Sequence, residues 1–365
     1  MIQEKLGNIV SFQRGYDLTH GQMHKGNIPV VGSSEIIGWH DIAKCEAPEL
    51  LIGRSGTVGR PQYYDCAVWP HNTTLFVTNF HGNNPKYCYY LLQNLNLEDY
   101  ANSSGVPTLN RNFIEPLQVE YHEKAEQSKI VDVLEAIDEK ISTNNKIIET
   151  SEKLMREIYD YWFMQFDFPD ENGRPYKSSG GEMVYDEKLK REIPKGWSVK
   201  RVDELCEVKT GKEDANFSVP DGDYKFFTCA DEPLRCNTPC FSGKSILIAG
   251  NGNFNVKHYD GNFNAYQRTY VLQPGDEFYG ITFIEAKNKT ELFTKGSNGS
   301  IVKFITKGDV GGISVLTSPR AMELYETFNT ILAEIDAVQS ENEKLASLRD
   351  WLLPMLMNGQ IKVSD

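Results

Sequence analysis

The sequence predicts an α+β protein in which two globular domains of mixed strands and short helices are joined by two long helices that form an antiparallel coiled coil. Two observations predict this architecture. Two long stretches carry apolar side chains at a seven-residue repeat, which is typical of helices that pack along one seam. The chain also repeats itself: Ile137-Asp138 aligns with Ile335-Asp336, and Leu154 aligns with Leu352 at the same offset. The fold is therefore predicted to have a pseudo-twofold internal repeat.

Residues 122–165 are predicted to form the central coiled-coil helix. Apolar residues recur there at alternating steps of four and three, and neither Pro nor Gly interrupts them. This spacing places the apolar side chains on one face, while charged and polar residues cover the other faces. The predicted interface residues of this helix are Ile130, Leu134, Ile137, Ile141 and Ile148.

Residues 320–357 are predicted to form the C-terminal coiled-coil helix, with a tail at 358–365. Its predicted interface residues are Leu324, Phe328, Ile331, Ile335, Val338, Leu345 and Leu352. A helix with one apolar stripe must bury that stripe, and the other copy is the economical partner. The alternative, two unrelated amphipathic helices that each pack on their own domain, stays open. Asn144 and Asn342 lie within the two seams, where polar residues cost stability but fix the register.

The predicted globular domains comprise residues 1–121 and 199–319, and residues 166–198 form a connector between the two repeats. Both domains contain short apolar runs separated by Gly, Asn and Pro, which is typical of short strands. Leu51–Gly56 in the first domain aligns with Leu247–Gly252 in the second. Since identity between the domains is low outside such anchors, a duplicated scaffold with two different surfaces is predicted.

Composition favours a soluble protein, because 40% of the residues are hydrophobic, 24% are charged and no apolar run is long enough for a membrane span. The first residues lack the pattern of a signal peptide, so a cytoplasmic location is expected. The seven cysteines are scattered, and their only cluster, Cys229, Cys236 and Cys240, contains neither a CxxC pair nor a nearby histidine. They are therefore expected to be reduced, and no metal site is predicted.

The net charge of −13 at first argues against binding to nucleic acid. Most of the acidic excess, however, lies on the two predicted long helices, which leaves the globular domains close to neutral. A neutral domain can still present a basic face to DNA.

No residue pattern for catalysis is legible. An adenine methyltransferase would need a glycine-rich cofactor loop and an Asn/Asp-Pro-Pro-aromatic tetrapeptide, and the nearest match, Asn84-Pro-Lys-Tyr87, is interpreted as a helix start. A nuclease would need clustered carboxylates and a lysine on core strands to hold its metal ion. The nearest candidates, Asp170 and Asp186, lie instead in the polar connector. The sequence therefore favours a binding protein over an enzyme.

Four segments carry a resemblance to a known family: Asn172–Gly181, Ile193–Trp197, Glu126-Gln127 near the start of the first long helix, and Trp351–Ile361. They resemble the specificity (S) subunits of type I restriction-modification systems, and the similarity extends over essentially the whole chain. The resemblance implies that 1–121 and 199–319 are target-recognition domains 1 and 2. Each would read one half of a bipartite DNA site, while the coiled coil sets the spacer and docks methyltransferase subunits. The chain itself would be a non-catalytic subunit of a methyltransferase and restriction endonuclease complex.

The same resemblance implies the partners. These are double-stranded DNA, two modification (methyltransferase) subunits that use S-adenosylmethionine, and restriction/translocase subunits that use ATP and Mg; the chain itself would bind no cofactor, no metal and no membrane. Two alternatives stay open. The chain could serve a system in which cleavage and methylation are fused in one partner, or it could be a coiled-coil adaptor without a role on DNA.

Base readout needs side chains that present paired donors and acceptors, such as Arg for guanine, Asn for adenine, and Ser or Thr for either. Glycine-rich loops let such residues approach DNA closely. The candidates in domain 1 are Arg14, Ser33, Ser34, Arg54, Ser55, Gly56, Thr57 and Arg60, and those in domain 2 are Lys209, Lys212, Asn251, Asn253, Asn255, Lys257 and Arg268. Ser103, Ser104, Asn298 and Lys303 are secondary candidates. The alternative interpretation is that these are ordinary turn residues, since turns favour Gly, Asn and Ser.

Overall fold

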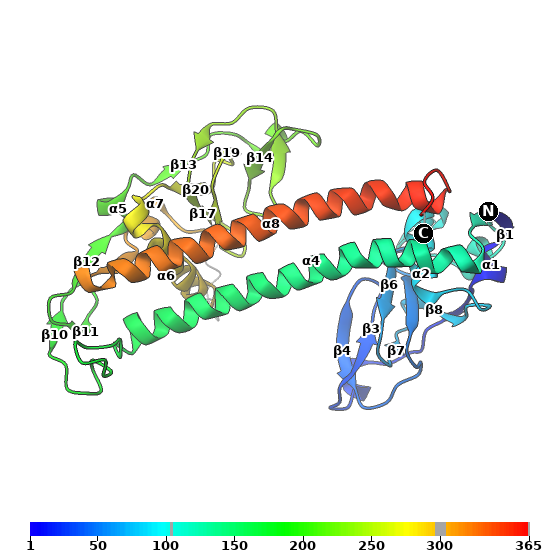
Figure 1. The fold of residues 1–365 in the computed structure, drawn as a ribbon, viewed down its shortest axis with the longest axis horizontal. Helices are drawn as coiled ribbons and strands as arrows, with labels where there is room; N and C mark the ends of the chain where they lie inside the picture. Colours follow the sequence, from blue (N-terminus) through cyan, green and yellow to red (C-terminus); the bar gives the residue numbers. More distant parts are fainter. Residues whose placement is uncertain (103–104, 296–303, 364–365) are drawn as a thin grey trace. The chain divides into compact units, whose positions relative to one another are not determined.

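The computed structural model describes residues 1–102, 105–295 and 304–363 (Figure 1). The chain divides into two compact units: unit 1 contains Met1–Thr143 and Asn342–Asp365, and unit 2 contains Asn144–Glu341. Each long helix contributes one half to either unit, so the units cut across the segment boundaries predicted from the sequence. The secondary candidates Ser103, Ser104, Asn298 and Lys303 lie outside the described residues.

The globular part of unit 1 is built mainly from short strands. Its elements are β1 (Ile2–Lys5), α1 (Leu6–Ile9), β2 (Ser11–Arg14), η1 (His20–Gln22), β3 (Ile28–Val31), β4 (Ile36–His40), β5 (Glu49–Gly53), β6 (Pro61–Tyr64), β7 (Trp69–Pro70), β8 (Thr74–Asn79), α2 (Pro85–Asn94), η2 (Leu97–Tyr100), α3 (Arg111–Ile114) and β9 (Gln118–Tyr121). The strands form a sheet in the order β2-β8-β5-β6, a sheet in the order β4-β3-β7 and the pair β1-β9. Leu50 and Ile52 of the buried strand β5 pack in one core with Tyr87 and Leu91 of α2.

The globular part of unit 2 follows the same plan. Its elements are β12 (Ser198–Arg201), α5 (Val202–Leu205), β13 (Lys209–Thr210), η4 (Ala215–Phe217), β14 (Tyr224–Phe227), β15 (Leu234–Cys236), β16 (Phe241–Ser242), β17 (Ser245–Ala249), β18 (Val256–Tyr259), β19 (Asn262–Ala265), β20 (Thr269–Leu272), α6 (Asp276–Lys295), α7 (Lys307–Gly311) and β21 (Ser314–Thr317). The sheets have the orders β13-β20-β17-β18, β15-β14-β19-β16 and β12-β21.

Strand pairing confirms the internal repeat. In unit 1, β3 pairs antiparallel with β4 and parallel with β7; in unit 2, β14 pairs antiparallel with β15 and parallel with β19. The buried central strands β5 and β17 occupy the same place in equivalent sheets. The repeats differ in helix length, because α2 has 10 residues whereas α6 has 20. The segment beginning at Asn84 is a helix as predicted, and the Asn84 side chain accepts hydrogen bonds from the backbone N–H groups of Lys86 and Tyr87.

The long helices are α4 (Lys124–Tyr159), extended by the π-helical turn η3 (Asp160–Met164), and α8 (Met322–Met357), preceded by η5 (Pro319–Ala321). In unit 1, Ile130 and Leu134 near the start of α4 share a core with Leu356 near the end of α8. In unit 2, Met155 near the end of α4 shares a core with Phe328 and Ile335 from the first half of α8. The helices therefore run in opposite directions, which confirms the antiparallel arrangement (Figure 1). No helix among the described residues combines the length and apolarity needed to cross a membrane.

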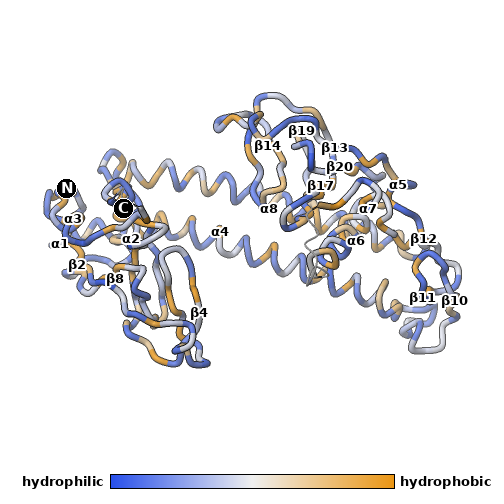
Figure 2. Tube along the Cα trace, turned by 180° about the vertical axis from the view of Figure 1, so that it is seen from behind, coloured by the Kyte–Doolittle hydropathy of each residue, from blue (hydrophilic) through white to orange (hydrophobic). Residues whose placement is uncertain are grey.

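The apolar faces of both helices contact their own globular parts as well as each other. Ile130 and Leu134 are in the same core as Tyr90 of α2, and Phe328 is in the same core as Ile281 of α6. Val131, outside the predicted seam, is also buried, so the apolar stripe of α4 is wider than a strict heptad seam. The sequence left open whether the long helices pack on each other or each on its own globular domain. Both kinds of packing occur, because a wide apolar stripe can contact two neighbours. Figure 2 shows the alternation of hydrophilic and hydrophobic residues along α4 and α8.

Polar contacts connect each long helix to its surroundings within its unit. Asp138 of α4 accepts a hydrogen bond from Tyr90 Oη at 2.7 Å and pairs with Arg349 of α8 at 3.0 Å. Its repeat equivalent on α8, Asp336, lies 3.1 Å from Nδ1 of His258 on β18. Asn144, fully buried in the seam, donates to Glu341 at 2.8 Å.

The connector after the π-helical turn contains regular secondary structure and buried aromatic residues. It contains the hairpin β10 (Met183–Asp186) and β11 (Arg191–Pro194). Phe163, Phe166 and Phe168 are buried around Trp197, with ring centroids 5.1 to 5.8 Å from the indole. These aromatic residues make the connector part of the core of unit 2.

Candidate nucleic-acid interface

In unit 1 the candidate residues gather at one end of the β2-β8-β5-β6 sheet. Arg14 closes β2, residues 54–60 join β5 to β6, and residues 71–73 precede β8. Because neighbouring strands of this sheet are antiparallel, these three segments lie together at the same end of the sheet. Backbone hydrogen bonds connect these segments: Arg54 N–H donates to Thr73 O at 2.8 Å, and Gly15 N–H, next to Arg14, donates to Thr74 O at 3.0 Å.

Asp17, a carboxylate that the sequence did not single out, connects Arg14 to Asn72 in unit 1. Asp17 Oδ1 lies 3.5 Å from Arg14 Nη2 and accepts a hydrogen bond from the Asn72 amide. Arg54 Nη1 donates to Asn72 O at 3.5 Å. Arg14 keeps 54% of its side chain exposed, so the guanidinium remains accessible to a ligand such as phosphate.

The remaining unit 1 candidates flank this cluster. Ser33 and Ser34 lie in the turn between β3 and β4, and the Ser33 hydroxyl is 3.7 Å from the position of a Cβ built on Gly56. Gly56 has a φ of +87°, a left-handed backbone that favours glycine. Arg60 and Ser34 line a polar cavity of about 560 Å³ that also includes Arg349 of α8. Ser55 is half-buried, whereas Thr57 and Arg60 are exposed.

In unit 2 the candidates occupy the equivalent end of the β13-β20-β17-β18 sheet. Residues 251–255 join β17 to β18, Lys212 follows β13, and Arg268 precedes β20. The Arg268 carbonyl accepts a hydrogen bond from Gly250 N–H at 2.8 Å, which joins two of these segments. Lys209 lies slightly apart, within β13 itself, where it pairs with Val271.

Asp231 organises the unit 2 loop. Its Oδ1 accepts hydrogen bonds from Asn253 at 2.7 Å and from Asn255 at 2.9 Å, and these bonds hold its pKa below the usual range. The ammonium group of Lys257 donates to the backbone carbonyl of Ala230. Burial lowers the pKa of Lys257, although the nearby Asp231 carboxylate opposes this effect. The amides that would read adenine are therefore held in place before any ligand binds.

We call the end of each four-stranded sheet that carries the candidate residues a platform: the β5–β6 loop and its neighbours in unit 1, and the β17–β18 loop and its neighbours in unit 2. The two platforms have the same backbone conformation but different side chains. Ser55 forms an isolated antiparallel β-bridge with Thr108 in unit 1, and Asn251 forms one with Phe304 at the equivalent position in unit 2. Gly56 and its counterpart Gly252 both have positive φ, of 87° and 76°. Arg54, by contrast, is replaced by glycine at 250.

The structure thus brings together most of the candidates, and contact with DNA stays a prediction for each of them. Sequence reasoning missed Asp17, Asn72 and Asp231. Only Asn72 has a recognisable signal, since it lies in a polar turn between two strands. The acidic residues belong to no motif, and their role becomes visible only through the hydrogen bonds that they accept.

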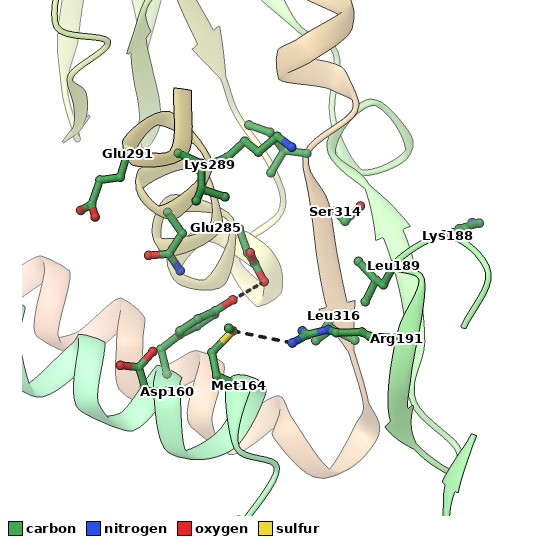
Figure 3. Close-up of a pocket in the computed structure, with 14 residues that line it drawn as sticks. Asp160, Met164, Lys188, Leu189, Arg191, Glu285, Lys289, Glu291, Ser314 and Leu316 are labelled. Atoms are coloured by element: carbon green, nitrogen blue, oxygen red, sulfur yellow. Dashed lines mark hydrogen bonds between the residues drawn. The ribbon is translucent and has the colours of Figure 1, made fainter. Parts of the chain in front are cut away.

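A second cavity, of about 530 Å³, lies in unit 2 between the end of α4, α6, β21 and the connector hairpin (Figure 3). Tyr159 Oη donates a hydrogen bond to Glu285 at 3.0 Å. Arg191 contacts Met164 at 3.7 Å and donates to Phe163 O at 3.2 Å. Burial raises the pKa of Glu285 to about 7, although the Tyr159 hydrogen bond and the Arg191 charge oppose this rise.

Replacing Glu285 by glutamine should make unit 2 less sensitive to pH. Because the pKa of Glu285 is higher in the folded state than in the unfolded state, the folded state retains a proton between about pH 4.3 and 7 that the unfolded state releases. The stability of the wild type therefore falls as pH rises through this window. We expect Glu285→Gln to be about 1–2 kcal/mol more stable than wild type at pH 8 and no more stable at pH 4. Denaturant unfolding at both pH values measures this.

Tyr159→Phe is the opposing variant, because it removes the hydroxyl that lowers the pKa of Glu285. It should increase the loss of stability between pH 5 and pH 8. Equal pH dependence in wild type and Glu285→Gln would contradict the assignment of this titration to Glu285.

Comparison with known proteins agrees with the repeat seen in the fold. Over residues 5–153 and 194–314 the chain matches the family described as "Type I restriction modification DNA specificity domain". It is 36% identical over 175 residues to the type I restriction enzyme EcoDI specificity subunit of Escherichia coli, an alignment that covers 46% of this chain and 39% of that protein. It is 32% identical over 312 residues to the type I restriction enzyme MjaIX specificity subunit of Methanocaldococcus jannaschii, covering 77% and 70% of the two chains.

A solved structure shares the fold. The S subunit of a type I restriction-modification system from M. genitalium superposes with a TM-score of 0.64 at 16% identity, covering 98% of this chain and 96% of that one. Each of the two family segments contains one of the sheet ends described above. The chain therefore belongs to the type I restriction-modification DNA specificity family.

Proposed function

We propose that this chain is the DNA sequence-specificity subunit of a type I restriction-modification complex, in which each globular part reads one half of a bipartite DNA site. The observation that carries the proposal is the duplicated platform with diverged side chains. Each unit has a glycine-containing loop at the equivalent end of its four-stranded sheet. Unit 1 presents Arg54 and Ser55 at the positions where unit 2 presents Gly250 and Asn251. Arginine favours guanine and asparagine favours adenine, so the two halves of the site should differ in sequence.

Methyl transfer and cleavage are assigned to partner proteins. Two modification subunits would bring S-adenosylmethionine, and restriction/translocase subunits would bring ATP and Mg. Exposed apolar side chains on the long helices support a docking role, since Leu348 and Trp351 of α8 are 44% and 54% exposed and Leu154 of α4 is 48% exposed. The antiparallel helices would also set the spacer between the half-sites.

Sequencing the methylated bases in cells that carry this chain and its modification subunit tests the proposal. We expect two short, different sequences separated by a spacer of fixed length. A continuous motif would contradict the bipartite model, and the absence of any methylation that depends on this chain would favour a coiled-coil adaptor. The identity of the partner polypeptide distinguishes separate subunits from a fused cleavage-methylation protein.

An alanine substitution in one platform should weaken recognition of one half-site and leave the other unchanged. Arg54→Ala removes a half-buried donor in the β5–β6 loop of unit 1, and Asn251→Ala removes a donor-acceptor pair in the β17–β18 loop of unit 2. Each change should reduce discrimination at its own half-site by about 1–3 kcal/mol, which is the value of one good base contact. Binding of the complex to oligonucleotides altered in either half measures this.

Lys153→Ala is the matched control, because Lys153 lies on α4 with 74% of its side chain exposed. It should leave discrimination at both half-sites unchanged. If Arg54→Ala and Asn251→Ala weakened the same half-site, the assignment of one platform to each half would fail.

A further inference from the structure

We propose that His24, His40 and Asp41 of unit 1 form a binding site for a divalent transition metal, with Zn²⁺ as the preferred ion. Their donor atoms all lie within 4.8 Å of one another, although His24 and His40 are far apart in sequence. Asp41 Oδ1 is 3.3 Å from His24 Nδ1 and 3.2 Å from His40 Nδ1. This site is independent of the candidate DNA-contacting residues.

The two distances from Asp41 fit tetrahedral coordination. Zn²⁺ binds histidine nitrogen and carboxylate oxygen at about 2.0–2.1 Å, which places neighbouring ligand atoms about 3.3 Å apart in a tetrahedron. The two separations from Asp41 agree with this value, and the two histidine donors lie within 4.8 Å of each other, so they would move closer together on the ion. Two imidazoles and one carboxylate also form a ligand set that suits zinc rather than Mg²⁺ or Ca²⁺, which prefer oxygen ligands.

The polar contacts of His40 show which interaction a bound ion would replace. His40 Nδ1 accepts a hydrogen bond from the backbone N–H of His24 at 3.0 Å, so this nitrogen presents a lone pair. The Asp41 carboxylate oxygen lies 3.2 Å from the same nitrogen. Nδ1 has a single lone pair in the plane of the ring, so an ion bound there would replace the His24 N–H as the partner of His40 and would share the Asp41 oxygen.

The backbone brings the ligands together before metal binds. His40 ends β4, where it pairs with Ile28 at the start of β3. A Cβ on Gly26 would lie 2.1 Å from His40 O, and a Cβ on Gly38 would lie 2.5 Å from Met23 Sδ. The two glycines therefore let residues 23–26 lie directly against β4, and this contact places His24 beside His40.

The burial of the three ligands gives the site one fixed side and one open side. The His40 side chain is 4% exposed and packs edge-on against Trp69, with ring centroids 5.1 Å apart. The side chains of His24 and Asp41 are 66% and 45% exposed, so an ion can enter and water can fill the fourth position. A bound ion would fasten the segment before β3 to the end of β4.

Titration of the full-length chain with Zn²⁺ by calorimetry tests the site. We expect one equivalent to bind to the wild type, and His24→Asn and Asp41→Asn each to weaken binding at least about tenfold. His20→Asn, four residues before His24 and also exposed, should bind as the wild type does. The exposed position of His24 means that His24→Asn leaves the core of unit 1 unchanged.

Amide hydrogen exchange provides a second readout that does not depend on DNA. Zn²⁺ should slow the exchange of residues 23–27 in the wild type and in His20→Asn, but not in His24→Asn. Equal Zn²⁺ binding by the wild type and His24→Asn would place the ion elsewhere in the chain. That result, or the absence of saturable binding, would overturn the proposal.

Discussion

Alanine at Gly211 should destroy the unit 2 platform while leaving unit 1 intact, and alanine at Gly15 should do the reverse. A Cβ on Gly211 would lie 1.9 Å from Ala265 O, and a Cβ on its repeat equivalent Gly15 would lie 2.1 Å from His71 O. Both obstacles are backbone atoms, so neither is relieved by moving a side chain. Separation of the strands should cost about 3 kcal/mol or more within the affected unit.

The functional consequence should be specific to one half-site. Gly211 N–H donates to Thr269 O and Gly15 N–H donates to Thr74 O, each at the sheet edge that carries the candidate residues. We therefore expect each variant to lose recognition of one half-site completely. Amide exchange of β13 and β20 in Gly211→Ala, and of β2 and β8 in Gly15→Ala, should show the local damage independently of DNA.

Gly21→Ala is the control for this pair. A Cβ on Gly21 would have no atom within 4 Å, and the φ of Gly21 is not positive. This variant should therefore fold and bind as the wild type does. Loss of both half-sites in Gly211→Ala alone would show that the two units do not recognise DNA separately.

Truncation of Phe163 should cause the largest loss of stability in unit 2. Phe163 is fully buried, its ring stacks on Tyr159 at 5.3 Å and on Tyr325 at 6.2 Å, and it contacts Trp197 edge-on at 5.4 Å. Removing it leaves a cavity where the end of α4, the start of α8 and the connector meet. Phe163→Ala should cost about 3–5 kcal/mol, as measured by denaturant unfolding of the full chain.

The adjacent Met164→Ala is the matched control, since Met164 is 50% exposed. It should cost less than about 1 kcal/mol. If the two variants were equally stable, the aromatic cluster would not be the part of unit 2 that joins the connector to the long helices.

The residue pattern predicted the long helices well because their determinants are local. A heptad of apolar residues without Pro or Gly specifies a helix of that length wherever it occurs, and α4 and α8 follow the predicted ranges closely. The internal repeat was also readable, since anchors such as Leu51–Gly56 and Leu247–Gly252 became equivalent strands and loops. Asn84 became a helix cap, as its position before a proline indicated.

The candidate site was predictable only in part. Glycine-rich loops between apolar strands pointed to Arg54 and Asn251, because loops that follow buried strands lie at sheet edges. The partners that hold these loops were not predictable: Asp17 accepts a hydrogen bond from Asn72 in a different turn, and Asp231, which follows β14 of the other sheet, accepts one from Asn253. Such contacts depend on which strands become neighbours, and residue spacing does not encode that.

The sequence by itself determined a duplicated chain with two long amphipathic helices, because periodicity and repetition are properties of residue order. Only the tertiary structure decided that those helices bury their wide apolar stripes against both each other and the globular parts. It also decided that His24 lies beside His40 and Asp41, and that the connector aromatics share one core. The physical reason is that these contacts join residues distant in sequence, whose proximity arises from strand pairing and close backbone approach.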